Sequence, residues 1–169
     1  MSRALPLVLA AFLAACGDPV HADAVEALGP EADGVEPGPL HRPGQPCLTC
    51  HGGKGPGNME FSVAGTIYKY ADSSEPLANA VVKLVDQGGP STIVGTNCAG
   101  NFFVQRVDFD PVFPLWTRVK LGSIDIEMST PVFGAGSCAH CHSDPPTESS
   151  VGRIYVAPAG TELPGGSCP

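Results

Sequence analysis

Two short segments, residues 47–51 (CLTCH) and 138–142 (CAHCH), constrain this chain more than any other feature. Each has two cysteines separated by two residues and a histidine directly after the second cysteine. At this spacing two thiols can add to the vinyl groups of one haem, and the histidine then lies under the porphyrin as proximal iron ligand. With 7 cysteines and 5 histidines in 169 residues, two such matches are not expected by chance. The motifs predict two covalent haem c groups, named haem one and haem two in chain order.

The two motifs resemble the haem-attachment sites of c-type cytochromes. Two other interpretations of the C-x-x-C pairs stay open. A zinc site made from both pairs usually has its halves about 15–20 residues apart, far closer than here. A redox dithiol usually accompanies a βαβ pattern, which neither pair has around it. The expected attachment residues are Cys47, Cys50, Cys138 and Cys141, and the expected proximal ligands are His51 and His142.

The remaining histidines and methionines are candidates for the distal side of each iron. His140 lies between two anchoring cysteines and cannot easily reach over its own haem, so we expect it either at haem one or facing solvent. His41 is the candidate for haem two, with a surface histidine as the alternative, and Met59 is a second candidate for haem one. We expect His21 to be unused and Met128 to lie in the core. Bis-histidine ligation would give a lower potential than histidine–methionine ligation.

The first residues indicate export. A short apolar run at 4–13 follows Arg3 and is too short to span a bilayer as a permanent helix. It ends in small residues and then Cys16, which resembles the lipobox of bacterial lipoproteins and implies that Cys16 is lipidated. An ordinary signal peptide cut nearby is the alternative. We therefore expect a signal peptide at 1–15 and a lipid-anchored protein in the periplasm or at the cell surface. Glycine after Cys16, in place of aspartate, favours the outer membrane.

The next segment, residues 16–46, is rich in proline, glycine, alanine and acidic side chains, with Arg42 as its single strong base. It shows no convincing apolar period. Segments of this composition cannot bury enough apolar surface to fold alone. The sequence predicts a lipidated, disordered, acidic tether, followed by one haem-bearing domain at 47–169.

From residue 61 the hydrophobic period changes to two, which is typical of half-buried strands. Turn residues rich in glycine and proline separate the segments. Seven short strands with no long helical pattern predict an all-β fold, a seven-stranded antiparallel β-sandwich. The predicted strands are 61–68, 80–85, 91–96, 101–104, 115–121, 123–128 and 151–156.

Three segments, 65–68 (GTIY), 76–84 (PLANAVVKL) and 96–104 (TNCAGNFFV), resemble the carboxypeptidase regulatory-like, or transthyretin-like, sandwich. The resemblance covers roughly 61–128 and the final strand. It implies the fold and no activity, because such domains serve as structural modules. Members of the family do not generally carry haem, so the function must come from the two motifs.

Strand direction predicts that the two motifs are neighbours. If the strands alternate in direction, the start of the first, the end of the sixth and the start of the seventh share one end of the sandwich. One motif directly precedes the first strand, and the other lies between the sixth and seventh. Opposite ends of such strands would be about 20 Å apart. We therefore expect two covalent haems at one end, close enough to exchange an electron directly.

Two cysteines, Cys98 and Cys168, lie outside the motifs and the lipobox. In an exported protein they are expected to form a disulfide, with two free thiols as the alternative.

The net charge of −8 makes nucleic acid and anionic lipid surfaces poor partners. We expect a redox protein with a basic patch as partner, and the membrane only through the lipid anchor.

These features together favour an electron carrier. Two other functions stay open. A haem peroxidase or small-molecule reductase would need an iron with an open distal position. A non-haem adhesion or scaffold lipoprotein would hold metal or disulfides in the C-x-x-C pairs.

Overall fold

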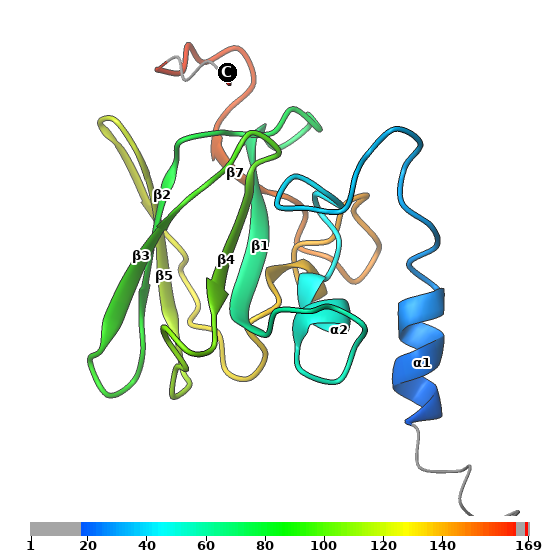
Figure 1. The fold of residues 1–169 in the computed structure, drawn as a ribbon. Coiled ribbons are helices and arrows are strands. Elements are labelled where there is room, and N and C mark those ends of the chain that lie inside the picture. Colours follow the sequence, from blue (N-terminus) through cyan, green and yellow to red (C-terminus); the bar gives the residue numbers. More distant parts are fainter. Residues whose placement is uncertain (1–17, 165–167, 169) are drawn as a thin grey trace, which may run out of the picture.

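Seven strands in two facing sheets form the body of the protein (Figure 1). The structure is a computed structural model, and it describes residues 18–164 and residue 168. One sheet has the strand order β4-β1-β7, and the other has the order β3-β2-β5-β6. The strands are β1 (Phe61–Tyr70), β2 (Val81–Val85), β3 (Ser91–Gly95), β4 (Asn101–Gln105), β5 (Trp116–Leu121), β6 (Ile124–Glu127) and β7 (Ile154–Ala157).

The strands form where apolar residues recur with a period of two. In β2, Val82 and Leu84 are fully buried between the sheets, while Val81 and Lys83 face solvent. Burying one such aliphatic side chain contributes about 1.5–3 kcal/mol relative to leaving it exposed. Each of the seven predicted strands overlaps an observed one, so the prediction of an all-β fold with seven strands is confirmed.

The prediction of a purely antiparallel sandwich is wrong at one edge. Strand β7 runs parallel to β1, with Ile67 opposite Ile154 and Tyr68 opposite Tyr155. The other strand neighbours pair antiparallel. The first and seventh strands share a direction because an even number of reversals separates them, and parallel neighbours need a long crossover. The crossover between β6 and β7 contains the second cysteine motif.

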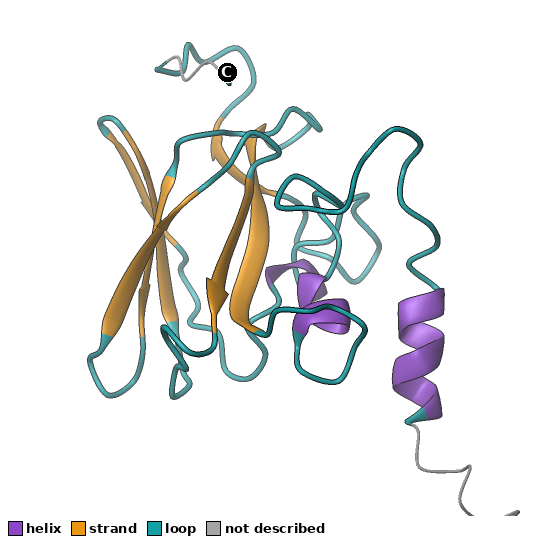
Figure 2. Ribbon diagram, viewed as in Figure 1, coloured by secondary structure: helices purple, strands orange, loops and turns teal. Residues whose placement is uncertain are grey.

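Strand β1 is buried on both of its faces. Residues 61–68 are all buried, whereas β2 alternates between buried and exposed positions. Val63 and Ile67 pack into the core between the sheets. Two short helices, α2 (Cys47–His51) and the 3-10 helix η1 (Cys138–His140), contact β1. Figure 2 shows them in purple on the side of the three-stranded sheet that faces away from the other sheet.

Residues 18–46 differ from the expected disordered tether. Helix α1 (Pro19–Glu26) begins with Pro19 and is capped by Asp18, whose side chain accepts a hydrogen bond from the His21 amide. The chain then returns to the sandwich, where the Asn101 side chain donates to the backbone oxygen of His41 at 2.9 Å. These contacts reach residues far along the chain, which composition alone does not reveal. Within the part of the chain that the structure describes, no helix has the length and apolar character to cross a membrane.

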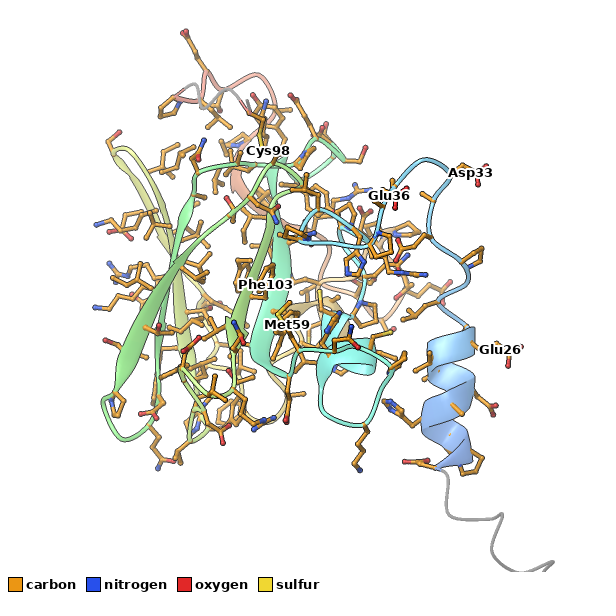
Figure 3. The ribbon with its side chains drawn as sticks, in the orientation of Figure 1. Glu26, Asp33, Glu36, Met59, Cys98 and Phe103 are labelled. Carbon is orange, nitrogen blue, oxygen red and sulfur yellow. A yellow bond between two sulfur atoms is a disulfide. The ribbon has the colours of Figure 1, made fainter. Side chains whose placement is uncertain are left out.

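Cys98 and Cys168 form a disulfide, as predicted, with their Cα atoms 5.5 Å apart. It ties the C-terminal tail to the turn before β4, where Figure 3 labels Cys98. Cys16 and the expected signal peptide lie outside the described residues.

Candidate functional site

The first motif forms a single helical turn. Helix α2 starts after its N-cap, Pro46, and ends at His51, with Gly52 as the C-cap. Residues three apart on a helix lie on the same face, so Cys47 and Cys50 point to one side of this turn. The loop that follows folds back over the turn, because the Gly57 amide donates to the Cys50 oxygen at 2.9 Å.

The second motif forms a similar turn. The 3-10 helix η1 is extended by two backbone hydrogen bonds to the Cys138 oxygen, from Cys141 at 3.2 Å and from His142 at 2.8 Å. The chain enters this turn along β1, since the Ala64 amide donates to the Gly136 oxygen at 2.9 Å. Both motifs therefore present two thiols from one helical turn beside the same strand.

The two turns are neighbours, as the strand directions predicted, but their position differs from the expectation. Both lie against β1 and cover its outer face, whereas we expected them at one end of the sandwich. Cys138 packs directly on Gly65 in the middle of β1, where an added Cβ would be 2.9 Å from the Cys138 sulfur. Phe61, at the start of β1, stacks on the His51 ring with a centroid separation of 4.5 Å.

Burial shifts the pKa of one thiol in each motif. Burial raises the pKa of Cys47 to about 11 and that of Cys138 to about 12. The charge of the Cys47 thiolate would raise the Cys138 pKa further, which reflects how close the two motifs are. The described residues contain no group of three or more histidine, cysteine or acidic side chains placed to bind a metal ion.

Both motif histidines are oriented by a backbone oxygen. The His51 Nδ1 atom is 2.9 Å from the Met59 oxygen, and the His142 Nδ1 atom is 2.8 Å from the Gly152 oxygen. A carbonyl oxygen can only accept, so each Nδ1 carries the proton and donates it. In the neutral ring the Nε2 atom then has a free lone pair. Metal-ligating histidines are typically held in this way.

A third histidine lies opposite His51. The rings of His41 and His51 have their centroids 6.0 Å apart and their planes tilted by 60°. The His41 Nδ1 atom lies 3.1 Å from a Glu31 carboxylate oxygen but forms no hydrogen bond with a described residue. The sequence analysis expected His41 at haem two, but the structure brings it to the first motif.

Arg42 holds the segment that carries His41. Its guanidinium donates to Glu31 at 2.7 Å and to Gln45 at 2.8 Å, and also to the backbone oxygens of Leu28 at 3.1 Å and Gly29 at 2.6 Å. This one side chain therefore ties the residues after α1 to those before α2. Sequence reasoning missed the role of Glu31 and Arg42, although Arg42 stood out as the only strong base in an acidic segment.

A groove of about 750 Å³ runs along the first motif. This volume falls within the roughly 300–1,000 Å³ that is typical of cofactor sites. Figure 3 labels Phe103 and Met59 beside α2, at the sheet side of this region. The groove is lined by His41, Cys47, Cys50, His51, Met59, Phe61, Phe103 and residues of the N-terminal segment such as Val25 and Leu28.

The other candidate ligands occupy different places. His140 is exposed on the second turn. Met128 is half-buried, not in the core as expected, and its sulfur accepts from the Thr117 hydroxyl at 3.5 Å on the four-stranded sheet. His21 is half-buried on α1, and its Nε2 atom is covered without a hydrogen-bond partner among the described residues.

A polar network fixes the segment after the second motif. The Tyr68 hydroxyl donates to Asp144 at 2.5 Å, and Arg153 Nε donates to the other Asp144 oxygen at 2.7 Å. Burial and the neighbouring Asp144 raise the pKa of Tyr68 well above its ordinary value. Asp144 follows His142 closely in the chain, so this network anchors the second motif to β1.

Comparison with known proteins found no matching family model, no similar curated protein and no similar solved structure.

Proposed function

We propose that this chain is a lipid-anchored dihaem c-type cytochrome that carries electrons in the periplasm or at the outer membrane. The observation that carries the proposal is the pair of helical C-x-x-C-H turns side by side on β1. In both turns the histidine donates from Nδ1 to a backbone oxygen and keeps Nε2 free, as an iron ligand requires.

Haem one would be attached through Cys47 and Cys50, with His51 as the proximal ligand and His41 as the distal one. Metal–imidazole bonds are about 2 Å long, so rings with centroids 6.0 Å apart leave room for one metal atom between them. The groove beside them and its aromatic wall suit a flat apolar cofactor. Two histidine ligands would give haem one a lower potential than a histidine–methionine pair.

Haem two would be attached through Cys138 and Cys141, with His142 as the proximal ligand. Cys138 packs on the same strand that supports the first motif. The haems would then be near neighbours, and an electron could pass between them within one molecule. A haem would supply the one-electron chemistry, and β1 would fix one attachment turn relative to the other.

The charge supports an electron carrier that meets its partners briefly. A net charge of −8 favours a redox partner with a basic surface and gives fast, salt-dependent encounters. Electron-transfer encounters usually bury small interfaces. The membrane would be contacted only through lipid on Cys16.

The experiment that tests this proposal compares two double variants of the exported protein, Cys47→Ser/Cys50→Ser and Cys138→Ser/Cys141→Ser. Each should lose one of two haems, and a potentiometric titration of the wild type should resolve two one-electron couples. The matched control, Cys98→Ser/Cys168→Ser, removes two cysteines outside the motifs and should keep both haems. Full haem content in either motif variant, or a wild type without redox activity, would contradict the proposal.

A further inference from the structure

The side chains that could close the distal side of an iron are unevenly distributed between the two motifs. Soluble carriers usually close this position with histidine or methionine. The chain has 5 histidines and 3 methionines, and His51 and His142 are assigned to the proximal sides. The described residues include the other three histidines and two of the methionines, so their positions can be compared.

Two of these five side chains lie at the first motif. His41 faces the His51 ring, and Met59 lines the same groove. His21 lies on α1 and is not among the residues that line this groove. The first motif therefore has two candidate distal ligands beside it, His41 and Met59.

The second motif has no comparable partner within the described part of the chain. Met128 lies on the four-stranded sheet, which is the sheet that does not carry the motifs. His140 is the remaining histidine, but it sits inside the attachment turn between Cys138 and Cys141 and is exposed. A side chain there is held at the edge of its own porphyrin and cannot reach across to the iron.

We infer that haem two has an open sixth position and binds small exogenous ligands. The ferrous iron would bind neutral diatomic molecules, and the ferric iron would bind cyanide. The inference rests on the proposed function, since it needs haem at both motifs. Cys141 and residues 145–149 around the second turn are exposed to solvent. The two haems would then have different roles. Haem one would be six-coordinate and would only exchange electrons, while haem two would also bind an exogenous ligand.

The test is a carbon monoxide titration of the reduced, exported full-length protein after its haem content has been counted. We expect one carbon monoxide bound per two haems, and a high-spin ferric signal from half of the iron. No binding, or binding to both haems in the wild type, would overturn the inference. A chain without two haems would instead refute the proposed function, so the two failures are distinguishable.

Three variants identify which iron binds. His41→Ala/Met59→Ala should raise the stoichiometry to two per chain, because haem one loses both of its candidate distal ligands. The Cys138→Ser/Cys141→Ser protein, which would keep only haem one, should bind none. His140→Ala is the matched control and should leave the stoichiometry at one. A wild type that binds none together with a His140→Ala variant that binds one would make His140 the distal ligand of haem two and overturn the inference.

Discussion

The imidazole rings of His41 and His51 both line the groove beside the first cysteine motif, with their centroids 6.0 Å apart and their planes tilted by 60°. His51 comes from the attachment turn on β1, whereas His41 comes from the segment that precedes it. The backbone of His41 is held by Asn101 at the start of β4, and its ring lies against Glu31. The N-terminal segment is therefore part of the site, beyond any role in linking the domain to a lipid anchor.

Arg42→Leu should loosen the segment that carries His41. The substitution removes hydrogen bonds to Glu31, Gln45 and two backbone oxygens, and charged hydrogen bonds of this kind contribute about 1.5–3 kcal/mol each when they are partly buried. We expect the free energy of unfolding to fall by about 1–3 kcal/mol, because the freed oxygens regain water. We also expect haem one to bind carbon monoxide more readily than in the wild type. Urea unfolding and ligand titration measure the two effects.

The control for this change is Arg118→Leu. Arg118 pairs with Asp125 and Glu127 on the four-stranded sheet, so its loss should alter stability little and leave ligand binding unchanged. Equal carbon monoxide binding by the Arg42→Leu variant and the wild type would show that Arg42 does not position His41.

Gly65→Ala should disturb the second motif more than the fold. The new Cβ would lie 2.7 Å from the Cys138 Cβ atom and 2.9 Å from its sulfur, so η1 must shift away from β1. Overpacking of this kind costs about 1–3 kcal/mol. We expect the haem content of the purified variant to fall toward one per chain, as measured from the reduced spectrum and the intact mass.

Gly95→Ala, at a glycine in another strand, is the control for Gly65→Ala. At Gly95, on β3, an added Cβ meets its nearest neighbour, the Ala80 oxygen, at 3.9 Å, which is an ordinary contact. Gly95→Ala should therefore keep both haems. If Gly65→Ala also keeps both, the second attachment turn does not depend on its close packing against β1.

Cys98→Ala/Cys168→Ala should lower stability without changing the haems. The disulfide closes a loop with a sequence separation of 70, which corresponds to about 4 kcal/mol in the chain-entropy description. The variant should unfold at lower urea concentration and give the same haem spectrum as the wild type. Alkylation of either cysteine in the unreduced wild-type protein would argue that the bond is not formed.

We predict that the contribution of Tyr68 to the free energy of unfolding decreases at alkaline pH. The Tyr68 residue is only 3% exposed, and burial and the neighbouring Asp144 raise the pKa of its hydroxyl, so the folded state favours the neutral form. A group whose pKa is raised on folding contributes stability below its unfolded pKa, about 10 for tyrosine, and loses it as the pH rises above that value. The wild type should thus be more stable than Tyr68→Phe near pH 8, with a smaller difference near pH 11. Urea unfolding at both pH values tests this, with the exposed Tyr155→Phe as control. A stability difference that does not change with pH would rule out the predicted contribution of Tyr68.

The sequence predicted the parts of this structure that depend on local pattern. The alternation in residues 80–85 marks β2 because period two places Val82 and Leu84 on the buried side. The disulfide followed from an even number of leftover cysteines. The neighbouring motifs followed from strand direction, since that argument needs only the order of the elements.

Two features that depend on long-range contacts were not predicted, the pairing of β7 with β1 and the placement of His41. The parallel pairing of β7 with β1 needs knowledge of which strands become neighbours, and direction alone does not provide it. The placement of His41 depends on Asn101, far along the chain, and on Glu31 and Arg42, whose acidic and proline-rich surroundings are typical of a disordered segment.

The central claim is that each C-x-x-C-H turn carries one covalent haem. The most direct measurement is a pyridine haemochrome spectrum of the exported protein, quantified per polypeptide and checked against its intact mass. We predict two c-type haems per chain, held through Cys47, Cys50, Cys138 and Cys141. If the chain is exported in the presence of a working haem-attachment system and carries no haem, the account is contradicted. The protein would then be a β-sandwich with a different function.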